Sequence, residues 1–211
     1  MASCWDGVDA VLYINLEHRT DRREHLLAQL EAVGVPQDKV WRVDAVRKEP
    51  GALGCTLSHI KAFQMILDRG WERALVLEDD FSWMPGTGAA SAGKVIKDLM
   101  TCRKSWDIVQ ISWNPSGRMV GEGPLPWMQR AVGVRTTSGY FVRRGFVEEL
   151  MENFKEAAVA MFKEGWSAER CCDMNWQKLQ FSSDWYVAYP PLGYQIDGYS
   201  DVEGKDVSYG C

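Results

Sequence analysis

One short segment constrains this chain more than any other: an apolar run at residues 73–77 leads directly into three acids, Glu78, Asp79 and Asp80. A strand that is buried on both faces of a sheet cannot hold three carboxylates, so the acids must project where the strand leaves the sheet. In α/β folds that carboxyl edge is where ligands bind. The segment therefore predicts an α/β fold with an acidic ligand site at the edge of its sheet.

Apolar runs alternate with amphipathic segments along the rest of the chain. We expect strands at residues 9–16, 40–43, 73–77, 107–112, 139–143 and 185–188, and helices at residues 20–33, 54–69, 94–100 and 145–162. This alternation predicts a mostly parallel sheet with helices on both faces. Residues 114–127 are rich in Pro and Gly, which indicates a long loop able to close over a ligand. The length of 211 residues fits a single domain.

Composition excludes several classes of protein. With 24 Lys and Arg against 29 Asp and Glu, the formal net charge of −5 offers no positive field for nucleic acid or an anionic membrane. No apolar run approaches the roughly 20 residues that span a bilayer, and no secretory signal begins the chain, so we expect a cytoplasmic protein. The six cysteines include no Cys-x-x-Cys pair and the three histidines all precede residue 60, which argues against a zinc site.

The acids at residues 78–80 favour a hard divalent cation. Carboxylate oxygens with no Cys or His beside them in the sequence suit Mg²⁺ or Mn²⁺, which would bridge the protein to a diphosphate. A solvated acidic turn after a strand explains the same three residues. The local signal leaves both interpretations open.

Two further segments carry candidate binding residues. Asn15, Arg19 and Arg22 lie where the first expected strand ends and the first expected helix starts, where an amide can contact a base or ribose and arginines can pair with phosphate. An ordinary solvated helix start is the competing interpretation. His59, near the start of the second expected helix, could donate to a phosphate oxygen, although an isolated histidine is more often structural.

Taken in order, four motifs resemble those of the family 25 glycosyltransferases, which include bacterial lipooligosaccharide and procollagen sugar transferases. They are INLEHRTDR at residues 14–22, GCTLSH at 54–59, LEDD at 77–80 and TSGY at 137–140. The match runs through most of the chain. The ending, with PPLGYQ at 190–195 and SDV at 200–202, is most similar to glycosyltransferase domains of large algal viruses, in particular the amino-terminal domain of a chlorella virus multidomain enzyme.

The resemblance implies a GT-A-like, Rossmann-like fold, a nucleotide-diphosphate sugar donor and a Mn²⁺ or Mg²⁺ ion. Glu78 or Asp79 would face the ribose or sugar, and Asp80 would ligate the metal. Relatives tend to show Pro-Val-Asp late in the chain, whereas this chain has CCDMNW at residues 171–176, so Asp173 corresponds only by its position before a helix. Many GT-A enzymes also use a late histidine as a metal ligand. None follows His59 here, so Asp197, Asp201 or water must substitute.

The implied reaction moves a hexose or deoxyhexose, from a donor that is UDP-linked, to a hydroxyl of a glycan or glycoprotein. If the configuration inverts, a carboxylate must take the hydroxyl proton, and Asp173 is our candidate. Residues 1–112 would then form the nucleotide- and metal-binding part, and residues 113–211 the acceptor side, with Trp113, Trp127 or Trp176 as an apolar floor for a sugar ring.

Two other functions remain open at this stage. A non-catalytic nucleotide-sugar or glycan-binding module would keep the fold without turnover. A metal-dependent phosphohydrolase would use the same acids without an acceptor sugar. In every case the expected partners are small molecules and glycans, with further domains possible in a longer polypeptide, and a viral protein would act in the host cytoplasm.

Overall fold

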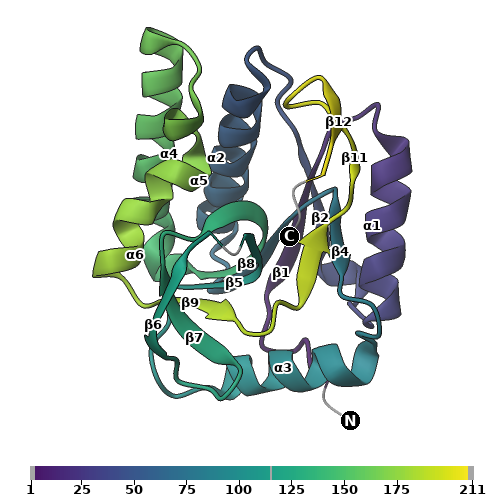
Figure 1. The fold of residues 1–211 in the computed structure, drawn as a ribbon. Coiled ribbons are helices and arrows are strands. Elements are labelled where there is room, and N and C mark those ends of the chain that lie inside the picture. The colour runs from purple at the N-terminus through teal and green to yellow at the C-terminus, as the bar shows by residue number, and fades with distance from the viewer. Residues whose placement is uncertain (1–2, 115, 209–211) are drawn as a thin grey trace.

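The apolar runs form the middle of one large sheet in the computed structural model, which describes residues 3–114 and 116–208 (Figure 1). Within the described residues the sheet has eight strands in the order β2-β1-β3-β8-β5-β9-β7-β6. These strands are β1 (Ala10–Asn15), β2 (Val40–Asp44), β3 (Arg73–Glu78), β5 (Ile108–Asn114), β6 (Arg118–Glu122), β7 (Met128–Val132), β8 (Arg135–Arg143) and β9 (Trp185–Ala188).

The sheet is mixed but mostly parallel in direction. β1 pairs in parallel with β2 and β3, and β5 pairs in parallel with β9. β8 lies antiparallel between β3 and β5, so these two neighbours of β8 point the same way. The predicted mostly parallel α/β architecture is confirmed, and β2, β1 and β3 end at one common edge.

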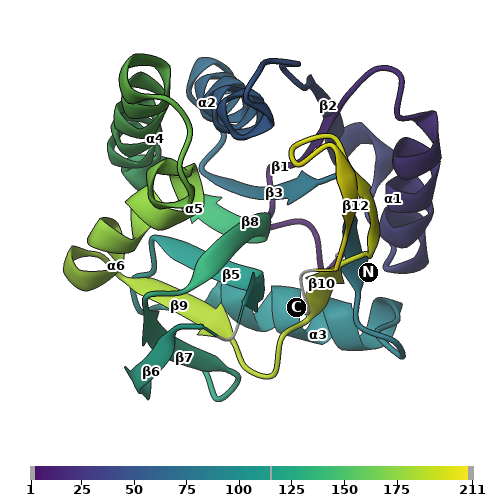
Figure 2. The same cartoon turned by 45° about the horizontal axis from the view of Figure 1, so that its top comes forward.

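Helices cover both faces of the sheet (Figure 2). α2 (Gly51–Arg69) and α4 (Arg144–Glu164) pack on one face, and α1 (Thr20–Ala32) and α3 (Ala89–Thr101) on the other. In β3, Ala74 and Val76 enter the first core while Leu75 and Leu77 enter the second. A strand that feeds two cores must be apolar at every position, which explains the uninterrupted run.

Short elements complete the chain. They are β4 (Phe81–Trp83), β10 (Gly193–Gln195), β11 (Gly198–Ser200), β12 (Lys205–Val207), α5 (Cys172–Asn175), α6 (Leu179–Ser182), and the 3₁₀ turns η1 (Gln37–Lys39), η2 (Ala168–Arg170) and η3 (Trp176–Lys178). β4 pairs with β10, and β11 pairs with β12. The C-terminal strands thus return to the region where β3 ends, which places late residues beside the acidic segment.

The predicted loop at residues 114–127 is wrong. β6 and β7 form an antiparallel hairpin at the far edge of the sheet, and the Gly123 amide donates to the Met128 carbonyl at 2.8 Å to close its turn. The Pro and Gly residues that indicated a loop are largely those of this hairpin and its turn. Asn114 alone of this segment's described residues reaches the cavity described below, and Pro115 lies outside the described residues.

The backbone at the start of α2 closely approaches two other segments, the loop that precedes α2 and the C-terminal hairpin. A Cβ added at Gly54 would lie 2.4 Å from the Val46 carbonyl oxygen, and one added at Gly51 would lie 2.4 Å from the Val202 Cα. Only glycine allows such contact between backbones. The start of α2 is therefore flanked by residues 45–48 on one side and by the β11–β12 hairpin on the other.

Candidate active site

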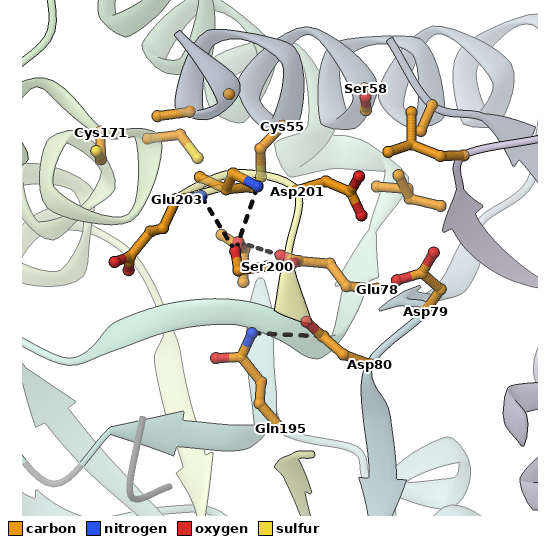
Figure 3. A pocket seen from close by; sticks show the side chains of 18 of the residues that line it. Cys55, Ser58, Glu78, Asp79, Asp80, Cys171, Gln195, Ser200, Asp201 and Glu203 are labelled. Carbon is orange, nitrogen blue, oxygen red and sulfur yellow. Dashed lines mark hydrogen bonds between the residues drawn. The ribbon is translucent and has the colours of Figure 1, made fainter. Parts of the chain in front are cut away.

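A cavity of about 450 Å³ opens at the edge where β1 and β3 end, between α2 and the C-terminal hairpin (Figure 3). Its walls come from the loop before α2, the N-terminal half of α2, the acidic segment after β3, the start of β8, the start of α5 and the C-terminal hairpin. The lining residues used below are Arg22, Arg47, Lys48, Cys55, Glu78, Asp79, Asp80, Arg135, Thr136, Thr137, Cys171, Asp173, Gln195, Tyr199 and Asp201. The volume suits a ligand of the size of a nucleotide sugar.

Asp79 and Asp80 share one guanidinium. Nη1 of Arg22 donates to Asp79 Oδ1 and to Asp80 Oδ2, each at 3.1 Å. Asn15 Nδ2 donates to the other oxygen of Asp79 at 2.7 Å, and Gln195 Nε2 donates to Asp80 Oδ1 at 3.4 Å. Both carboxyl groups are buried, so these contacts fix their orientation at the end of β3.

Glu78 turns toward α2 instead. Its Oε1 accepts a hydrogen bond from Thr137 Oγ1 at 2.5 Å and another from His59 Nε2 at 3.2 Å. Because the carboxylate can only accept, Nε2 carries a proton, and His59 Nδ1 lies within hydrogen-bond distance, 2.9 Å, of the Tyr140 hydroxyl. Burial alone raises the pKa of Glu78, but the hydrogen bonds and the interaction with His59 outweigh it and lower the pKa below the usual range. Glu78 is thus held as an anion.

The acidic segment carries more negative charge than its surroundings compensate. Burial, followed by the charge of Glu78, raises the pKa of Asp80 to about 7, and burial also raises the pKa of Asp79. Arg22 opposes both shifts but is one cation against three carboxylates. A set of buried carboxylate oxygens with this excess charge fits a hard divalent cation.

Asp173, at the start of α5, lines another part of the cavity. Its Oδ2 accepts a hydrogen bond from the Thr136 amide at 3.3 Å, and burial raises its pKa. Thr136 has φ of 80°, a left-handed conformation that is strained for a β-branched residue. Such strain is frequent where a backbone is shaped for a ligand.

The predicted binding residues separate into two groups. Arg22, Glu78, Asp79, Asp80 and Asp173 line the cavity together. Four others lie outside the described lining: Asn15, Arg19, His59 and Asp197. Of these, Asn15 supports Asp79 and His59 supports Glu78 from behind.

Arg19 engages the C-terminal hairpin. Its Nη1 donates to Asp201 Oδ2 at 2.5 Å and to the Tyr199 carbonyl at 3.2 Å. Asp201, the alternative to Asp197 as a late acid, lines the cavity and is already paired with Arg19. The geometry gives Arg19 the task of anchoring the hairpin.

The predicted tryptophan floor is wrong for this cavity. Trp176 is fully buried, Trp113 is nearly so, and neither Trp113, Trp127 nor Trp176 belongs to the described lining. The indole N–H of Trp113 donates to the Ala188 carbonyl at 2.8 Å, and that of Trp176 to the Val134 carbonyl at 3.2 Å. These residues pack the core because large rings between α4 and the sheet bury the most apolar area.

Sequence reasoning missed several lining residues. Arg47, Lys48 and Arg135 are exposed lining residues that bring positive charge to the cavity, alongside the exposed Glu49 and Glu203. The basic pair just before the second helix is a signal that could have been found in the sequence. Cys55 was also missed, although its position four residues before His59 places both side chains on one face of α2.

Comparison with known proteins shows a local similarity to one family. The model of glycosyltransferase family 25 (LPS biosynthesis protein) matches residues 49–86, which include the start of α2 and the acidic segment. Procollagen galactosyltransferase 2 of Mus musculus is 26% identical over 130 residues, covering 50% of this chain and 21% of that protein. Inactive glycosyltransferase 25 family member 3 of Homo sapiens is 29% identical over 173 residues, covering 69% and 29%. The chain thus spans less than a third of the length of these relatives.

Solved structures share the fold. A glycosyltransferase involved in the glycosylation of the major capsid of PBCV-1 superimposes with a TM-score of 0.54 at 14% identity, covering 92% of this chain and 95% of that one. A mannose-1-phosphate geranyltransferase from Thermus thermophilus gives a TM-score of 0.50 at 14% identity, covering 85% and 72%. The fold is GT-A-like. Within the described part of the chain, no helix is both long and apolar enough to cross a membrane.

Proposed function

We propose that this chain is a metal-dependent glycosyltransferase that moves a hexose or deoxyhexose from a nucleotide-diphosphate sugar, UDP-linked, to a hydroxyl of a glycan or glycoprotein. One observation carries the proposal. Two buried carboxylates after β3, Asp79 and Asp80, share the Arg22 guanidinium beside a third carboxylate, Glu78, and the lining of the same cavity also includes the exposed Arg47, Lys48 and Arg135. A divalent cation would bind between the carboxylates and a diphosphate, and the basic side chains would pair with other oxygens of that diphosphate.

The residues of this cavity suit separate steps. Asp80, with Asp79 beside it, would hold a Mn²⁺ or Mg²⁺ ion, whose chemistry is to stabilise the charge of the leaving diphosphate. Arg47 and Lys48 would pair with phosphate oxygens. Glu78, kept ionised by Thr137 and His59, would accept hydrogen bonds from sugar or ribose hydroxyls.

Asp173 suits the proton transfer of an inverting reaction. It lines the same cavity as the acids, and its raised pKa favours proton uptake from an attacking hydroxyl. The partly exposed Cys171 lies beside it on the same wall. The acceptor side would accordingly be formed by α5 and the start of β8, together with the C-terminal hairpin.

A panel of donors tests the proposal. The protein is mixed with Mn²⁺ and with UDP-, GDP- and dTDP-sugars, and the melting temperature and the release of nucleoside diphosphate are measured. We expect a UDP-sugar to raise the melting temperature and to be hydrolysed or transferred in a Mn²⁺-dependent way. A panel in which no sugar nucleotide stabilises the protein would contradict the proposal.

One relative favours a second function. A relative at 29% identity is named an inactive member of the family. A non-catalytic sugar-nucleotide-binding module is therefore the second candidate. In the same panel it would show stabilisation by a donor without nucleotide release, even when glycan acceptors are added.

A further inference from the structure

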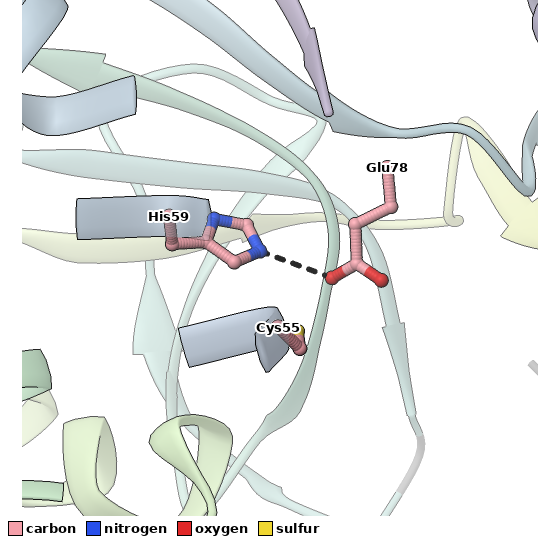
Figure 4. Close-up of side chains that lie close together, drawn as sticks. All are labelled: Cys55, His59 and Glu78. Carbon is pink, nitrogen blue, oxygen red and sulfur yellow. Dashed lines mark hydrogen bonds and ion pairs between the residues drawn. The ribbon is translucent and has the colours of Figure 1, made fainter. Parts of the chain in front are cut away.

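A second cluster of ligand-type side chains lies in the wall of the cavity next to α2 (Figure 4). Among the described residues, Cys55, His59 and Glu78 form a group whose ligand atoms all lie within 4.8 Å of one another. Cys55 and His59 are four residues apart on α2, so the helix presents both from one face. Glu78 comes to them from the end of β3, where its Oε1 is 3.2 Å from His59 Nε2.

We propose that Cys55, His59 and Glu78 form a site for a thiolate-binding divalent ion of the Zn²⁺ type, separate from the Asp79 and Asp80 carboxylates. The donor set of one sulfur, one imidazole nitrogen and one carboxylate oxygen suits Zn²⁺ and disfavours Mg²⁺. Three protein ligands leave a fourth position, which faces the cavity because Cys55 and Glu78 line it. An ion can therefore enter from solvent without opening the core.

The surroundings supply the outer contacts that such a site needs. A metal on His59 Nε2 requires the proton to move to Nδ1, and the Tyr140 hydroxyl, 2.9 Å from Nδ1, can then accept that proton's hydrogen bond. The Thr137 hydroxyl also holds Glu78, through a hydrogen bond to Oε1. On binding, the Cys55 thiol releases its proton to solvent, and the His59 ring only changes tautomer.

Glu78 has different hydrogen-bond partners from Asp79 and Asp80, which keeps the two proposed sites distinct. Asp79 and Asp80 are engaged by Arg22, whereas Glu78 contacts His59 and Thr137. The edge of β3 would thus hold a hard ion through Asp80 and a softer ion through Glu78. The second site does not depend on the proposed transferase activity.

Cobalt is the probe, because Co²⁺ replaces Zn²⁺ and reports its ligands by absorption. The reduced full chain is titrated with Co²⁺ in the absence of any sugar nucleotide. We expect the visible bands of a tetrahedral ion and a near-ultraviolet band from thiolate-to-cobalt charge transfer. Both bands should disappear when Zn²⁺ is added in excess.

Variants assign the ligands. Cys55→Ser should abolish the charge-transfer band and weaken Co²⁺ binding roughly 100-fold or more, and Tyr140→Phe should weaken it about tenfold. Cys171→Ser is the matched control, because this thiol lines the same cavity but lies outside the group, and it should keep both bands. Circular dichroism confirms that each variant is folded.

Three outcomes would overturn the proposal. They are a wild-type protein that gives no charge-transfer band, a Cys55→Ser variant that keeps it, and an Asp80→Asn variant that loses it. The last result would merge the two sites into one. Because no donor is present, failure here leaves the transferase proposal to be judged by its own panel.

Discussion

The two walls of the cavity are built in different ways. The acidic wall comes from one continuous stretch, residues 78–80, at the end of a buried strand. A second wall combines Thr136 of β8 with Asp173 of α5, which are 37 residues apart in the sequence. The acidic wall holds excess charge on fixed carboxylates, and the second wall offers one partly buried carboxylate, Asp173, beside the strained backbone of Thr136. The first is suited to a cation and a diphosphate, and the second to a proton and an acceptor.

The largest expected effect belongs to the acidic wall. Asp80→Asn keeps the shape of the side chain but removes the charge that a divalent ion requires. We expect sugar transfer to fall roughly 10³-fold, since stabilisation of the leaving group is lost. Initial rates at saturating Mn²⁺ measure this effect. Unchanged rates would remove Asp80 from the metal site.

Asp173 provides the matching test on the second wall. Asp173→Asn should lower transfer roughly 10²-fold, the usual scale for a lost general base, while donor affinity stays near the wild-type value. Donor affinity is measured by calorimetry and transfer by product formation. A variant with normal transfer would point to a retaining reaction or to another late acid such as Asp201.

The metal-free protein should become less stable as pH rises. The pKa of Asp80 is about 7 in the folded chain, above its ordinary value of 3.8, so the folded state binds more protons between these values. The contribution of Asp80 to folding stability is then fully present at low pH and is lost as pH rises toward the folded pKa, by about 2 kcal/mol between about pH 5 and pH 7.

Urea unfolding of the metal-free protein at several pH values measures this slope. Asp80→Asn should flatten it, and Mn²⁺ should restore stability near neutral pH by compensating the ionised carboxylate. A wild-type slope that equals that of Asp80→Asn would show that Asp80 is not responsible.

The smallest effect is expected at Arg19. Its ion pairs with Asp21 and Asp201 are partly exposed, and such pairs contribute about 0 to 1 kcal/mol. Arg19→Ala should therefore lower the free energy of unfolding by no more than about 1 kcal/mol and change donor affinity little. Arg22→Ala is the contrasting variant, because it leaves two buried carboxylates without their shared cation. Equal effects of the two variants on donor binding would contradict the assigned roles.

The contrast between the walls also explains which parts of the fold and of the site could be predicted from the sequence. The strands at residues 9–16 and 73–77 were predicted because each feeds two cores and must be apolar throughout. The second helix was predicted to end at Gly70, which adopts the left-handed conformation of a helix C-terminus. Its start was placed three residues late, since Gly51 begins the helix.

Local sequence patterns do not predict contacts between segments that are far apart in the chain. Arg22 lies 57 residues from Asp79, and no spacing rule indicates that they share a hydrogen bond. The hairpin of β6 and β7 was missed because Gly and Pro mark hairpin turns and open loops alike. Cys55 and His59 are visible in the sequence at helical spacing. The pair was missed because a zinc site was expected only from Cys-x-x-Cys pairs or short Cys/His clusters.

The central claim is that the acidic wall binds a nucleoside diphosphate through a divalent cation. Calorimetric titration of UDP into the protein tests it most directly, once with Mn²⁺ and once with a chelator, for the wild type and for Asp80→Asn. The account predicts binding by the wild type in Mn²⁺, and loss of that binding in chelator and in the variant. UDP binding with the same affinity in chelator, or in Asp80→Asn with unchanged metal dependence, would contradict it.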